Sequence, residues 1–142
     1  MGRFILGMAL FAAVSLPSWA SNWVALGEGG DGQFMISVDL DSLQQHGAYR
    51  TVVERFAYRR PAQYPGGRWI YAVTAHRSYE CQQRTALLLQ GFAYGDANAT
   101  VPIATVKHHN IPANYAVVAP HSPEDTVFKR VCAPVGAVSW PQ

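Results

Sequence analysis

The sequence predicts an α+β fold: an antiparallel β-sheet of about six strands with a C-terminal α-helix packed on one face and one disulfide. Apolar and polar residues alternate in residues 33–40 and again in 69–81, which is typical of strands buried on one side. A helical pattern follows over residues 122–132. Cys81 ends the second of these strands and Cys132 ends the helix, so a bond between them would fix the helix on the sheet.

Residues 1–20 have the composition of a secretory signal peptide. Arg3 supplies a positive charge, residues 4–16 are apolar, and a helix breaker with a small-x-small cleavage site ends at Ala20. The apolar run is short for a bilayer of about 30 Å, so cleavage is expected rather than anchoring. We therefore expect a signal peptide over 1–20 and one domain over 21–142, exported to the periplasm or the outer cell surface.

Two cysteines in an exported chain indicate a disulfide rather than two free thiols. They lack the paired spacing of a zinc site, and the adjacent His108 and His109 would point to opposite faces of a strand. No metal and no cofactor are expected. Without Arg3 the formal net charge falls from +2 to about +1, which gives no reason to expect nucleic acid as a partner.

The chain contains no recognised catalytic motif, so we expect a protein that is not an enzyme. The alternative is a small hydrolase that uses Glu54 and Glu80 as an acid pair across neighbouring strands. Carboxylates in such positions more often pair with arginine, and Arg77 is close in sequence.

The first half of the chain predicts three strands and two reversals. Residues 23–26 form a short strand, and a hairpin turn at Asp31 and Gly32 leads into the strand over 33–40. Residues 41–47 are expected to form one helical turn that reverses the chain. The third strand then spans residues 48–58.

The second half predicts further strands and the helix. The strands are expected over residues 69–81, 84–94, 100–107 and 111–119. Ser122 is an N-cap, Pro123 suits the first helical position, and apolar residues recur every four positions up to Cys132.

The connection over residues 59–68 is rich in arginine, proline and glycine, and is expected to be exposed. Its candidate partner-binding residues are Arg59, Arg60, Tyr64 and Arg68. Arginine offers a planar fork that suits carboxylates and aromatic faces. The alternative is an ordinary hairpin connection whose charges keep it in solution.

Three segments together resemble a known family. The strand and turn ISVDLDSL (36–43), the segment SYEC (78–81) and the helix VVAPHSPEDTVFKRVC (117–132) occur in an order similar to that of the surface-adhesin protein E family of Gram-negative bacteria. The resemblance implies an antiparallel sheet with a C-terminal helix packed on it. It also implies binding to host extracellular-matrix and plasma proteins.

These observations favour an exported binding protein that holds a protein partner. The alternative is a periplasmic envelope accessory or inhibitor protein with no adhesin role. The namesake of the family is a lipoprotein, but no cysteine stands at or near Ala20, so no lipid anchor is expected. The assembly state stays open between a monomer and a homodimer.

Overall fold

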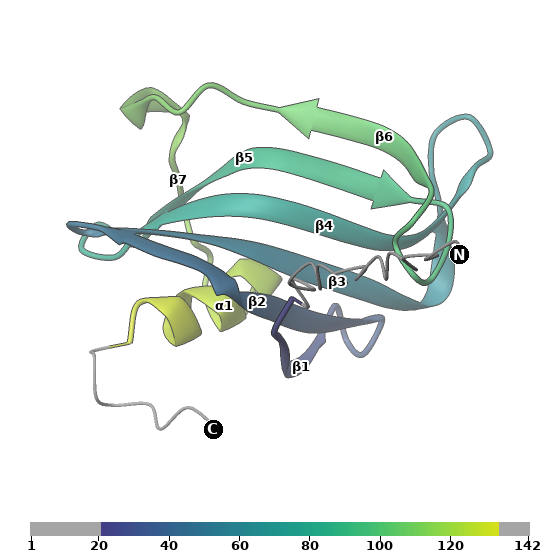
Figure 1. The fold of residues 1–142 in the computed structure, drawn as a ribbon, viewed down its shortest axis with the longest axis horizontal. Coiled ribbons are helices and arrows are strands. Elements are labelled where there is room, and N and C mark those ends of the chain that lie inside the picture. Colours follow the sequence, from purple (N-terminus) through teal and green to yellow (C-terminus); the bar gives the residue numbers. More distant parts are fainter. Residues whose placement is uncertain (1–20, 134–142) are drawn as a thin grey trace, which may run out of the picture.

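The computed structural model describes residues 21–133, which form an antiparallel sheet and one α-helix. The sheet order is β1-β2-β3-β4-β5-β6, and a short seventh strand pairs with β5 (Figure 1). The bounds are β1 Trp23–Gly29, β2 Phe34–His46, β3 Tyr49–Gln63, β4 Trp69–Glu80, β5 Thr85–Tyr94, β6 Pro102–Lys107 and β7 Ala116–Val117, with a 3₁₀ helix η1 at Pro112–Asn114. The predicted fold class is confirmed. The predicted signal peptide (1–20) and residues 134–142 of the predicted domain lie outside the described residues.

The helix α1 (Pro123–Val131) forms where the sequence predicts it. The Ser122 hydroxyl accepts a hydrogen bond from the Asp125 backbone N–H at 3.2 Å, which satisfies one of the free amides of the first turn. Cys81 and Cys132 are bonded, with their Cα atoms 5.5 Å apart. The predicted disulfide is therefore confirmed, and it joins the end of the helix to the end of β4.

The core lies between α1 and the first strands of the sheet. Val127, Phe128 and Val131 of the helix are buried against apolar side chains that alternate along the strands. The odd-numbered face of β4 points toward the helix, and the Tyr79 ring lies 6.2 Å from the Phe128 ring. Figure 1 shows α1 beside β2 and β3, away from β6. The helix thus covers only part of the sheet face on which it packs.

The reversal at residues 41–47 is not a helical turn, so that prediction is wrong. β2 continues to His46 through a register shift between Asp39 and Gln44. The Ser42 hydroxyl donates to the Asp39 carbonyl at 2.6 Å and accepts from the Val53 backbone N–H at 2.8 Å. These side-chain hydrogen bonds hold an irregular strand, because they satisfy the backbone groups that the shifted ladder leaves free.

The predicted strand over residues 111–119 is also wrong for most of its length. Pro112 has no backbone N–H to donate and begins η1, and β7 then spans only Ala116–Val117. The connection at 59–68 is shorter than predicted, because β3 extends to Gln63. A register shift between Ala57 and Ala62 allows Pro61 to sit in the strand.

A charged cluster is buried under the helix. The carboxylate of Glu54 is fully buried; it accepts hydrogen bonds from Arg77 Nε and, at 2.7 Å, from the Tyr79 hydroxyl. Arg77 Nη2 also lies 3.6 Å from Glu124 at the start of α1. Burial raises the pKa of Glu54, whereas the charge of Arg77 opposes that change. The cluster ties β3, β4 and α1 together.

Asp125 fixes the start of the helix. It is buried, accepts a hydrogen bond from the His121 backbone N–H at 2.9 Å, and pairs with Arg84 and Lys129. The His121 N–H and the two cations lower the pKa of Asp125 to about 2, from a usual value of 3.8. The folded chain therefore favours the ionised carboxylate more than the unfolded chain does.

No helix within residues 21–133 is long and apolar enough to cross a membrane.

Replacing both cysteines by serine should lower the free energy of unfolding by roughly 4 kcal/mol, because the bond closes a loop of about fifty residues. Urea unfolding followed by circular dichroism measures the change. Wild-type protein treated with reductant is the matched control and should unfold with the double variant. Equal midpoints for the oxidised wild type and the variant would contradict the role given to this bond.

Asp125→Asn should destabilise the protein at pH 7 and have little effect at pH 2. A lowered pKa in the folded state contributes stability above the usual value of 3.8, and that stability is lost as the pH falls through about 2. Thermal unfolding at several pH values measures the gap between wild type and variant. The exposed Asp41→Asn serves as control and should show no such gap. A gap that is constant with pH would refute the assignment.

Candidate functional site

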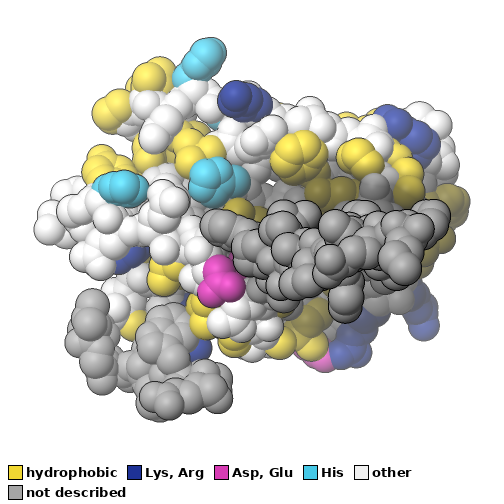
Figure 2. Space-filling model, in the orientation of Figure 1, with side chains coloured by type: hydrophobic (Ala, Val, Ile, Leu, Met, Phe, Trp, Pro, Cys, Tyr) yellow, Lys and Arg dark blue, Asp and Glu magenta, His cyan; other side chains and the backbone are white. Residues whose placement is uncertain are grey.

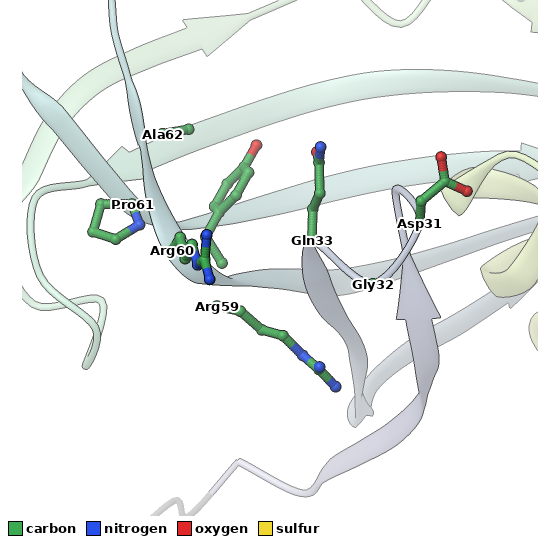
Figure 3. Close-up of a pocket in the computed structure, with 8 residues that line it drawn as sticks. Asp31, Gly32, Gln33, Arg59, Arg60, Pro61 and Ala62 are labelled. Carbon is green, nitrogen blue, oxygen red and sulfur yellow. The ribbon is translucent and has the colours of Figure 1, made fainter.

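A hollow of about 560 Å³ lies between the β1–β2 turn and the second half of β3. Asp31, Gly32 and Gln33 line it from the turn, and the residues around Arg60 line it from β3. Figure 3 shows Asp31 and Gln33 on one side, with Arg60, Pro61 and Ala62 on the other. The turn forms because Asp31 and Gly32 both adopt positive φ angles, of 55° and 81°, as the sequence predicts.

The two arginines of this hollow differ in their contacts. Arg59 forms an ion pair with Glu28 of β1, and in Figure 3 its side chain extends from β3 toward the strands joined by the β1–β2 turn. Arg60 is exposed and has no hydrogen bond or ion pair with any residue in 21–133. Its guanidinium therefore has all of its donors available to a ligand.

Tyr64 and Arg68 lie apart from that hollow, at the tip of the β3–β4 hairpin. The guanidinium of Arg68 lies 5.5 Å from the centre of the Tyr64 ring. Arg68 also donates a hydrogen bond of 2.7 Å to the Ile103 carbonyl of β6. The pair thus holds the hairpin against β6. Of the four predicted residues, only Arg60 has no side-chain hydrogen bond, ion pair or ring contact within residues 21–133.

On the face shown in Figure 2, basic side chains are more frequent at one end. In Figure 2 most Lys and Arg side chains lie toward the right, where Figure 1 places the β3–β4 hairpin. Histidine side chains lie toward the left, where Figure 1 places η1. The end that carries Arg59 and Arg60 is therefore the more basic one in this view.

The Glu54 and Glu80 pair is not formed. Glu54 pairs with Ala75 in the ladder and faces the helix, whereas Glu80 pairs with Tyr49 on the other face of the sheet. Glu80 accepts hydrogen bonds from the backbone N–H groups of Gln82 and Gln83, which cap the β4–β5 turn. Both carboxylates have structural partners, so the residues named for a hydrolase do not make one site.

Among residues 21–133 no group of three histidine, cysteine, aspartate or glutamate side chains lies close enough to hold a metal ion.

Sequence reasoning missed Asp31 and Gln33 as neighbours of the arginines. The ladder pairs Phe34 with Tyr58, and the Arg59 N–H donates to the Gln33 carbonyl at 2.9 Å. The alternation of residues 33–40 and 48–58 predicts two strands, but their register decides which turn residue meets which arginine.

A search of curated proteins finds no match to this chain. A family model, described as surface-adhesin protein E, matches residues 23–133. The match covers every strand and the helix described above, and it includes both cysteines. The chain therefore belongs to the surface-adhesin protein E family.

Proposed function

We propose that this chain is an exported binding protein that holds a protein partner in the hollow beside Arg59 and Arg60. The observation that carries the proposal is the unpaired guanidinium of Arg60 at the edge of a hollow of about 560 Å³. A guanidinium on a rigid strand can form two parallel hydrogen bonds with one carboxylate. The partner would therefore present an acidic side chain to β3.

Arg59 supports Arg60 in this role. Its ion pair with Glu28 joins two partly exposed side chains, so it contributes about 1 kcal/mol or less to stability. A partner carboxylate could replace Glu28 at small cost. Asp31 and Gln33 on the opposite side of the hollow would discriminate among acidic segments by repulsion and hydrogen bonding.

The membership in the surface-adhesin protein E family supports binding rather than catalysis as the activity. It favours host matrix and plasma proteins as the partners to test. A periplasmic accessory or inhibitor protein is the second candidate. The same hollow would then hold a partner of the cell envelope.

Replacing Arg59 and Arg60 together by alanine should weaken binding to an immobilised matrix or plasma protein by about tenfold or more, because charge-assisted hydrogen bonds contribute about 1.5–3 kcal/mol each. Surface plasmon resonance at several salt concentrations measures the loss, and the variant should also lose salt sensitivity. Arg50→Ala with Lys107→Ala removes the same charge outside this hollow and is the matched control. Tyr64→Ala with Arg68→Ala tests the other half of the predicted set. Unchanged binding by the Arg59→Ala, Arg60→Ala variant would contradict the placement of the partner site in this hollow.

Protease treatment of intact cells should cleave this protein while a known periplasmic protein survives. The expected result follows from surface display, since an adhesin must be accessible from outside the cell. The readout is an immunoblot of both proteins before and after the outer membrane is opened. If both survive until that membrane is opened, the periplasmic candidate replaces the adhesin.

A further inference from the structure

A second hollow, of about 330 Å³, lies on the face of the sheet opposite α1. Tyr49 and Thr51 of β3 line it and alternate with Val52, which points into the core. Ser78 of β4 pairs with Thr51, and His46 of β2 pairs with Tyr49. Neighbouring strands thus place four polar side chains side by side on one face.

The other wall of this hollow comes from the chain between β6 and β7. The Tyr115 hydroxyl lies 2.8 Å from Ser78 Oγ and 3.0 Å from Asn110 Oδ1. The Tyr49 and Tyr115 rings meet edge to face, with centres 5.7 Å apart. Ser78 is only 1% exposed. Buried Ser78 and its hydrogen bond to Tyr115 therefore fix the base of the hollow, and the rings of Tyr49 and Tyr115 form its sides.

The lining has a distinct chemistry. It contains no Asp, Glu, Lys or Arg side chain. The hydroxyls of Tyr49 and Thr51 and the amide nitrogen of Asn110 have no hydrogen-bond partner among residues 21–133. Tyr49 is 38% exposed, and its ring offers an apolar surface beside these groups. These hydroxyls and this amide carry no charge, and the hydroxyls can both donate and accept.

We propose that this hollow binds a neutral sugar. A pyranose ring has an apolar face of C–H groups and a rim of hydroxyls, which matches an exposed tyrosine ring beside uncharged donors and acceptors. An anionic ligand would meet no Lys or Arg in the lining, and a purely apolar ligand would leave the polar groups desolvated and unpaired. The volume of about 330 Å³ is within the range of small-ligand pockets.

This inference goes beyond the proposed function and shares no residue with it. The sugar site uses residues at the β2–β3 turn and before β7, whereas the protein-binding hollow uses the β1–β2 turn and Arg59–Arg60. Failure of one therefore leaves the other standing.

The test is an NMR titration of the isotope-labelled chain with the methyl glycosides of glucose, galactose, mannose and N-acetylglucosamine. At least one glycoside should shift the amide signals of Tyr49, Thr51, Asn110 and Tyr115, with a dissociation constant in the millimolar range. Tyr49→Ala and Asn110→Ala should each weaken that binding by about fivefold, since loss of an aromatic or hydrogen-bonding contact costs about 1 kcal/mol. Asn110 is exposed, so its variant should fold.

Trp69→Ala is the matched control, because Trp69 is 52% exposed and lies at the other end of β4. Its affinity for the glycoside should equal that of the wild type. The proposal is overturned if none of the four glycosides shifts these signals at tens of millimolar. It is also overturned if the shifts persist in Tyr49→Ala and Asn110→Ala. Binding of only a sulfated disaccharide, lost in Arg60→Ala, would move carbohydrate binding to the charged hollow and overturn it too.

Discussion

The packing of α1 on the sheet is the constraint on which the rest of the structure depends. A meander of neighbouring strands has two faces, and without the helix one apolar face would lie open to water. Val127, Phe128 and Val131 cover Ile36, Val38 and Val52, and the Cys81–Cys132 bond prevents the helix from leaving. Cys132 itself packs against this core, so the covalent bond and the apolar contacts hold the same helix on the sheet.

Charged side chains also depend on this packing. Glu54 is fully buried, and it is tolerated only because Arg77 and Tyr79 donate to it under the helix. Asp125 is also buried, and it accepts hydrogen bonds from Arg84 and from the His121 N–H. These carboxylates are therefore parts of the helix–sheet contact. Their burial and their partners give both carboxylates a structural role.

The arginines illustrate how similar residues acquire different roles. Arg77 and Arg84 are committed to buried carboxylates, and Arg68 holds the hairpin tip through Tyr64 and Ile103. Arg60 alone among the four predicted site residues has no contact of this kind within the described chain. A cluster of arginines in the sequence therefore contained one clear candidate for recognition.

Local pattern determined much of this protein. The alternation of apolar and polar residues predicts the strands, and Ser122 with Pro123 predicts the start of the helix, because both depend on residues close in the sequence. The disulfide is predicted because the chain has only two cysteines. The helical turn at 41–47 and the strand at 111–119 failed where side-chain hydrogen bonds of Ser42 and the missing N–H of Pro112 outweighed propensity. Only the tertiary structure decided which residues meet. Strand register brings Gln33 to Arg59, and register is fixed by the packing of the whole sheet rather than by any one segment. The path of the chain between η1 and β7 brings Tyr115 to Ser78.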